Sequence, residues 1–283
     1  MSNIRFSNKF SAAVFGLLIC AYPAQPAWAE GLASPWVEGF NNKVRLLAGK
    51  AGEGADAKIY AGIDIAMPAG WKTYWRAPGE AGGVPPEFDW AQSENLQEAL
   101  VLYPAPHRLI DKAGATIGYK DHVLFPVALT AKDPSKPILL KLKAAYGVCK
   151  ELCVPAEAEL GLAVPPDASP SDGIGSIVAT VPRTPALAGR DPEIASWRVD
   201  TRDSKPVLVI EVADKNGPGG DAFADVKGGT YLPLPKRIAD ANGHAVYEVD
   251  LTDGVDIKDL KGKQIAVTLV GTKGQSETSI TLP

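Results

Sequence analysis

The sequence predicts an all-β protein made of two β-sandwiches, the second smaller than the first. Three observations predict this fold. Twenty-eight glycines and 24 prolines are spread along the 283 residues, which favours short strands joined by turns. Several stretches alternate apolar and polar residues, as half-buried strands do. Hydrophobic residues make up 46% of the chain, enough for real cores. The net charge of -4 argues against a nucleic-acid binder, which would carry a basic stripe.

The first 29 residues have the features of a secretory signal. Two basic residues precede an apolar run at 12–21 that is too short to span a bilayer comfortably. Ala27-Trp28-Ala29 then fits the small-x-small cleavage rule. We therefore expect a soluble, exported chain that begins at Glu30, in a compartment where disulfides persist. An uncleaved membrane anchor is the alternative.

A first sandwich is expected over residues 30–164. Its strands are predicted at 43–49, 58–67, 71–76, 87–90, 99–103, 122–130, 138–146 and 156–164. The clearest is Ile138–Tyr146, in which five apolar residues face one way and two lysines the other. Six glycines and prolines between Ala77 and Pro86 predict a loop. Residues 104–120 contain two prolines and two glycines, and we predict an irregular surface loop there that covers another part of the protein.

The rest of the chain is expected to form a linker and a second β-sandwich. Residues 165–192 are predicted to be the linker, with one short helix at 171–181 that is capped by Ser171 or Asp172. Residues 193–283 are predicted to form the second sandwich from five or six short strands. The predicted strands are 196–201, 207–212, 247–251, 264–270 and 278–282. This half contains no cysteine, and we identify no chemistry in it.

Cys149 and Cys153 are the only cysteines expected after cleavage, and they follow the clearest strand. In an extended chain their Cα atoms would lie about 13 Å apart. A disulfide needs a separation of roughly 4.4 to 6.8 Å. The two can therefore bond only if residues 148–153 curl into a turn or a single helical turn.

Three functions fit this cysteine pair. A structural clip would close a very short ring, for which loop entropy supplies about 2 kcal/mol, against nearly 5 for a ring of about 100 residues. A thiolate site for Cu(I) would suit two sulfurs, but three histidines and Met67 offer no tight ligand cluster. A redox-active pair agrees best with a short ring that is easily reduced. Lys150 would favour a thiolate and Glu151 would oppose it.

We therefore favour thiol-disulfide exchange without a metal or another cofactor. A scaffold or binding module with an inert disulfide, and a copper-binding protein, are the alternatives. An exchange-active pair also needs shielding from wrong partners, and the 104–120 loop with the Trp71 and Tyr74 rings could supply it.

Three segments, in this order, carry a resemblance to a known family: Gly70–Arg76 (GWKTYWR), Tyr119–Val127 (YKDHVLFPV) and Tyr146–Pro155 (YGVCKELCVP). Over about residues 40–164 the chain resembles the periplasmic N-terminal domain of the DsbD thiol:disulfide interchange proteins, especially their ScsB-like branch. The resemblance implies an immunoglobulin-like sandwich in the periplasm. Its cysteine pair would take electrons from a membrane-embedded thiol transporter and pass them to periplasmic thioredoxin-fold disulfide proteins. The chain would then be a component of a protein-disulfide reductase.

The resemblance also implies roles for individual residues. Cys149 and Cys153 would exchange, with Cys153 reacting first, and the loop around 108–119 would cap them until a partner docks. Five residues are assigned to shielding or partner contact: Trp71, Tyr74, Leu109, Ile110 and Tyr119. The cysteines here are separated by three residues, where the best-known members have five. The transporter and the thioredoxin-like domain that usually follow are absent from this sequence, so we expect the electron donor to be a separate protein.

Overall fold

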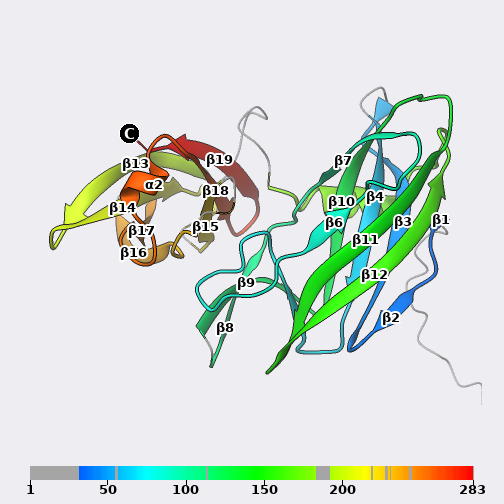
Figure 1. Ribbon diagram of the computed structural model, residues 1–283. Coiled ribbons are helices and arrows are strands. Elements are labelled where there is room, and N and C mark those ends of the chain that lie inside the picture. Colours follow the sequence, from blue (N-terminus) through cyan, green and yellow to red (C-terminus); the bar gives the residue numbers. More distant parts are fainter. Residues whose placement is uncertain are drawn as a thin grey trace, which may run out of the picture.

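The computed structural model describes residues 32–282, apart from 55–56, 113, 183–191, 218, 227–228, 230 and 242–243. These residues form two β-sandwiches that lie side by side, with only two short helices (Figure 1). The all-β fold class with a smaller second sandwich is therefore confirmed. The predicted signal segment lies outside the described residues, as does part of the predicted linker.

The first sandwich consists of two antiparallel sheets that face each other across one core. One sheet has the order β1-β3-β4-β10-β7, and β2 also pairs with β3. Its strands are β1 (Leu32–Ala33), β2 (Val37–Gly39), β3 (Asn42–Ala51), β4 (Lys58–Ala66), β7 (Leu96–Val101) and β10 (His122–Ala131). The other sheet has the order β12-β11-β5-β9-β8, and β6 also pairs with β11. Its strands are β5 (Lys72–Tyr74), β6 (Glu87–Asp89), β8 (His107–Asp111), β9 (Gly114–Lys120), β11 (Ile138–Cys149) and β12 (Cys153–Val164).

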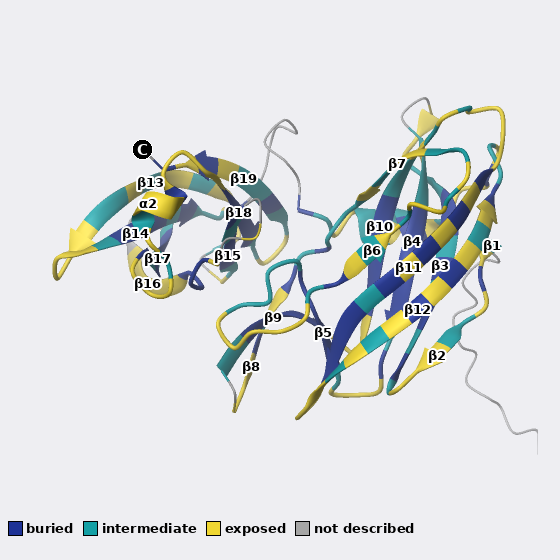
Figure 2. Cartoon of the chain, in the orientation of Figure 1, coloured by how far each residue is buried: buried dark blue, intermediate teal, exposed yellow. Residues whose placement is uncertain are grey.

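Strand alternation places the apolar side chains in this core, as predicted. Along β11 buried and exposed residues alternate from Ile138 to Ala144, and Lys141 and Lys143 point outward. Figure 2 shows the same alternation as dark and light stripes on β11 and β12. The end of β11 that leads to Cys149 is buried on both faces, which marks it as a different environment.

The prediction of an irregular loop at 104–120 is wrong. Most of this segment forms the β8–β9 hairpin, and β9 pairs with β5 as well. The glycine that suggested a break has a packing role, because a Cβ at Gly118 would lie 2.1 Å from the carbonyl oxygen of Thr73. A glycine in a strand therefore marks close contact between backbones here, and the hairpin joins the sheet that carries the cysteines.

The described residues of the second sandwich form seven strands in two sheets, ordered β13-β14-β17-β16 and β15-β18-β19. They are β13 (Glu193–Arg202), β14 (Lys205–Ala213), β15 (Asp221–Val226), β16 (Lys236–Ala241), β17 (His244–Asp250), β18 (Gln264–Val270) and β19 (Gln275–Thr281). The sequence prediction missed β15, β16 and the helix α2 (Ile257–Leu260). β15 was missed because its acidic residues and the glycines before it resemble a loop.

One short helix joins the two halves. The helix α1 (Asp172–Val178) begins after Ser171, whose hydroxyl accepts a hydrogen bond from the backbone N–H of Ile174 at 3.4 Å. This confirms the predicted cap, although the helix ends before residue 181. None of the helices in the described part of the chain has the length and apolar character needed to cross a membrane.

Candidate functional site

The β11–β12 hairpin places the two cysteines opposite each other. The strands pair residue for residue from Ile138–Val164 to Cys149–Cys153, and three residues form the turn. The cysteine Cα atoms lie 4.2 Å apart and the sulfurs are bonded. This separation is close to that of a non-hydrogen-bonded antiparallel pair, roughly 4.5 Å. The curl that a disulfide requires is therefore a hairpin turn.

The two cysteines differ in their access to solvent. Cys149 is 1% exposed and pairs with Lys72 on its other side, whereas Cys153 begins an edge strand and is exposed. Cys153 is therefore the more accessible of the two cysteines from solvent.

The hydroxyl of Tyr74 contacts both sulfurs of the disulfide. Its oxygen lies 2.8 Å from Sγ of Cys149 and 2.9 Å from Sγ of Cys153. Burial, together with the nearby negative charge of Asp111, raises the pKa of Tyr74. The hydroxyl therefore stays protonated at neutral pH and can donate a hydrogen bond to a thiolate. Such a charge-assisted bond is stronger than one to a neutral sulfur, so it favours the reduced, ionised product.

Two glycines hold the ring of Tyr74 in place. A Cβ at Gly83 would lie 2.3 Å from Cε1 of the ring, and one at Gly147 would lie 3.1 Å from Cε2. The carbonyl of Val84 accepts a hydrogen bond from the backbone N–H of Gly147 at 3.1 Å, which ties the 77–86 loop to β11. The predicted loop thus forms one wall of the site, and its Gly83 leaves room for the ring to lie against the backbone.

Two residues of the site, Lys72 and Asp111, were not predicted from the sequence. The Nζ of Lys72 donates to Oδ2 of Asp111 at 2.6 Å and to Oγ1 of Thr116 at 2.9 Å. The Lys72 side chain is only 9% exposed, and Asp111 ends strand β8. The ion pair therefore ties the β8–β9 hairpin to the strand beside Cys149. Strand alternation gives no sign that a lysine here is buried and needs a carboxylate so distant in the sequence.

Two of the other predicted contact residues lie on the surface. Trp71 is half-buried and packs edge-to-face against the exposed ring of Phe40, with centroids 6.0 Å apart. Ile110 is 76% exposed and precedes Asp111 in the hairpin. Both positions remain candidates for partner contact.

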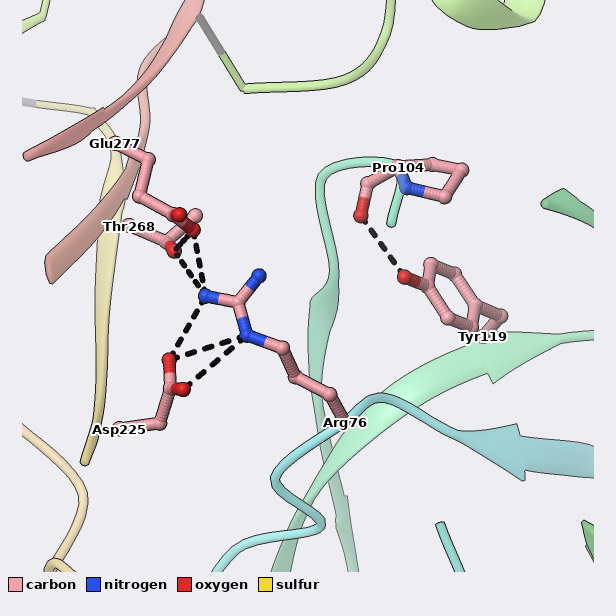
Figure 3. Close-up of polar contacts among 6 residues, drawn as sticks. All are labelled: Arg76, Pro104, Tyr119, Asp225, Thr268 and Glu277. Atoms are coloured by element: carbon pink, nitrogen blue, oxygen red, sulfur yellow. Dashed lines mark hydrogen bonds and ion pairs between the residues drawn. The ribbon is translucent and has the colours of Figure 1, made fainter. Parts of the chain in front are cut away.

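Leu109 and Tyr119 point into the protein instead. Leu109 is 8% exposed and Tyr119 is 4% exposed. The Tyr119 hydroxyl donates to the carbonyl of Pro104 at 2.8 Å (Figure 3). The Tyr119 ring packs against Phe125. Their burial does not fit direct contact with a partner, so of the two expected roles only shielding of the disulfide stays a prediction for them.

The described residues contain no group of three or more His, Cys, Asp or Glu side chains that could hold a metal ion. A copper site would therefore have to rely on the two sulfurs of this hairpin. The arrangement of one exposed cysteine, one buried cysteine and a hydroxyl that contacts both sulfurs suits exchange between disulfides.

Comparison with known proteins agrees with this chemistry. Residues 44–165 match the family model described as "Thiol:disulfide interchange protein DsbD, N-terminal". The first sandwich is therefore a domain of the thiol:disulfide interchange class. More particularly, it resembles the N-terminal domain of DsbD, as the sequence motifs predicted.

One solved structure shows the same fold across most of the chain. It is the crystal structure of the N-terminal periplasmic domain of ScsB from Proteus mirabilis, with a TM-score of 0.67 and 22% identity. The match covers 89% of this chain and 99% of that one, so the likeness extends into the second sandwich. No curated protein sequence matches the chain.

Replacing the hydroxyl of Tyr74 tests its role directly. We expect Tyr74→Phe to slow reduction of the disulfide by dithiothreitol about tenfold, because the leaving thiolate loses a hydrogen bond worth about 1.4 kcal/mol. Tyr119→Phe is the matched control, since it removes another buried hydroxyl that bonds to Pro104 and not to sulfur. Equal rates for Tyr74→Phe and the wild type would contradict the role.

Crowding the ring should have the same consequence. We expect Gly83→Ala to slow reduction and to destabilise the fold by about 1–3 kcal/mol, because the added methyl displaces Tyr74. Gly82→Ala is the control. Both glycines have a positive φ, 153° at Gly83 and 72° at Gly82, but nothing lies within 4 Å of a Cβ at Gly82. The measurement is thermal unfolding together with the reduction rate. The same slowing in both variants would show that backbone strain, and not the Tyr74 contact, causes it.

Proposed function

We propose that the protein is a periplasmic thiol-disulfide exchange module. It takes reducing equivalents from a membrane-embedded thiol transporter and passes them to periplasmic thioredoxin-fold disulfide proteins through Cys149 and Cys153. One observation carries the proposal: a single protonated hydroxyl lies within hydrogen-bond distance of both sulfurs of a disulfide with one exposed cysteine. The match to the DsbD N-terminal family supports it.

Reduction of the module begins at the exposed cysteine. A thiolate of the donor attacks Sγ of Cys153, the Cys149–Cys153 bond breaks, and Cys149 leaves as a thiolate that accepts the Tyr74 hydrogen bond. The second thiolate of the donor then attacks the donor's own sulfur in the mixed disulfide and releases Cys153. Two electrons have passed to the module, and the donor carries a new disulfide.

Delivery reverses these roles. The Cys153 thiolate attacks a disulfide of the acceptor and forms a mixed disulfide with it. The Cys149 thiolate then attacks Cys153, which re-forms the original bond and releases the reduced acceptor. Because Cys149 is buried, it resolves the complex from within and does not compete for the acceptor.

The surface near the disulfide suits a protein partner. Eight large apolar side chains are well exposed among the described residues, and four lie on segments linked to the disulfide hairpin. Leu152 is in the hairpin turn, Val84 bonds to β11 through its carbonyl, Ile110 neighbours Asp111, and Phe40 packs on Trp71. An apolar surface around a reactive sulfur is expected for docking another protein.

Trapping the mixed disulfide tests this function. We expect a reduced Cys149→Ser variant to form a covalent adduct with an oxidised thioredoxin-fold protein through Cys153, because no thiol remains to resolve it. A non-reducing gel, followed by mass spectrometry of the linked peptides, measures the adduct. Addition of dithiothreitol should release it.

The reciprocal variant is the control. Cys153→Ser retains only the buried Cys149, and we expect it to form much less adduct. If Cys149→Ser forms no adduct and shows only a lower unfolding temperature, the disulfide is structural and the scaffold alternative holds.

A further inference from the structure

One face of strand β15 in the second sandwich is directed at the first sandwich. Asp221, Phe223 and Asp225 alternate along β15, so their side chains share this face. The ring of Phe223 is 0% exposed and packs 6.0 Å from the ring of Trp75. The two carboxylates on either side of Phe223 each bind an arginine of the first sandwich.

Arg76 is held by all three strands of this sheet. Its Nη2 donates to Oδ1 of Asp225 at 2.8 Å, and it also binds Thr268 on β18 and Glu277 on β19. Figure 3 shows the guanidinium extending from the first sandwich between these side chains. The Arg76 guanidinium lies over the Trp75 ring, 4.0 Å from its centroid. A planar group held on two sides and stacked on a ring has little freedom to move.

Arg108 makes the second connection. Its Nε and Nη2 donate to the two oxygens of Asp221 at 2.9 and 2.8 Å. Nη2 also donates to the carbonyls of Ala222 at 3.3 Å and Pro235 at 2.9 Å. The guanidinium is thus bound bidentately and its remaining hydrogen bonds go to backbone, which makes the contact geometrically specific.

Both arginines are close in sequence to residues of the disulfide site: Arg76 to Tyr74, and Arg108 to Asp111. Tyr74 is the last residue of the three-residue strand β5, and Arg76 follows it by two residues. Arg108 is on β8, three residues before Asp111, and β8 pairs with β9, the neighbour of β5. Figure 1 shows the β8–β9 hairpin between the two sandwiches. The second sandwich therefore anchors the end of the strand that carries Tyr74 and the hairpin that supports that strand.

We propose that the second sandwich positions Tyr74 for disulfide exchange, with Asp221 and Asp225 as positioning residues that act through Arg108 and Arg76. The proposal rests on the function proposed above and gives this half of the chain a part in it. A hydroxyl that must reach two sulfurs at 2.8 and 2.9 Å tolerates little displacement, because hydrogen bonds weaken steeply with distance and angle. Tyr74 is the last residue of the three-residue strand β5, so a shift of that end of the strand would move its hydroxyl.

The test combines Asp221→Asn and Asp225→Asn in the full chain. Both substitutions keep the shape of the side chain and remove its charge. We expect the rate of disulfide reduction by dithiothreitol to fall about fivefold, part of the loss expected for Tyr74→Phe. When the same pair of substitutions is made in a Tyr74→Phe protein, we expect no further loss, because the hydroxyl that they position is already gone.

Two further variants separate positioning from general destabilisation. Glu211→Gln removes the carboxylate that pairs with Arg198 on the other sheet of the second sandwich, and Glu211 is as exposed as Asp221, 32% against 31%. We expect it to leave the rate unchanged. Asp225→Glu keeps a carboxylate at the interface and should retain most of the wild-type rate. Should the double variant fail to fold, Asp221→Asn alone provides the same comparison.

Two results would overturn the proposal. One is a folded double variant that is reduced as fast as the wild type. The other is a double substitution that slows reduction by the same factor in a Tyr74→Phe protein as in the wild type, since its effect would then not pass through the hydroxyl. If the wild-type cysteines exchange with no protein disulfide, the proposed function fails. The positioning role is still tested separately, because it depends only on the rates at which dithiothreitol reduces the double variant and the wild type.

Discussion

The register of the β11–β12 hairpin is the constraint on which the site depends. Twelve residue pairs place Cys149 opposite Cys153, and alternate apolar side chains of β11 fix that register through the core. A slip of one residue would turn those side chains to solvent and would separate the cysteines. The disulfide therefore sits at the end of a ladder that the core holds in register, and its short ring adds only about 2 kcal/mol of loop entropy.

Three polar side chains that are buried beside the disulfide each have a partner. Lys72 pairs with Asp111, the Thr73 hydroxyl donates to the carbonyl of Gly147 at 2.9 Å, and Tyr74 contacts the sulfurs. Satisfied polar groups of this kind define one geometry more strictly than apolar packing does. The first sandwich supplies the chemistry, and in our account the second holds the segments on which Tyr74 depends. Two sandwiches joined through arginines can thus act as one site.

The fold class, the clearest strands and the cysteine pair could be predicted from the sequence, because they depend on local alternation and on residue type. The sequence also identified Tyr74, through its resemblance to a family. It did not reveal that Gly118 lets β9 lie against β5, or that Gly83 contacts the Tyr74 ring, because glycine signals a turn as readily as a close approach. Lys72 was missed because its partner is 39 residues away, a contact that only the folded chain defines.

The reduction potential of the Cys149–Cys153 pair tests the central claim most directly. It can be measured by equilibrating the purified protein in glutathione buffers and counting free thiols by alkylation. Our account predicts a value near or above about -250 mV, among the proteins that exchange disulfides. A value below about -300 mV would mark a bond that resists reduction, and it would contradict a role in passing electrons.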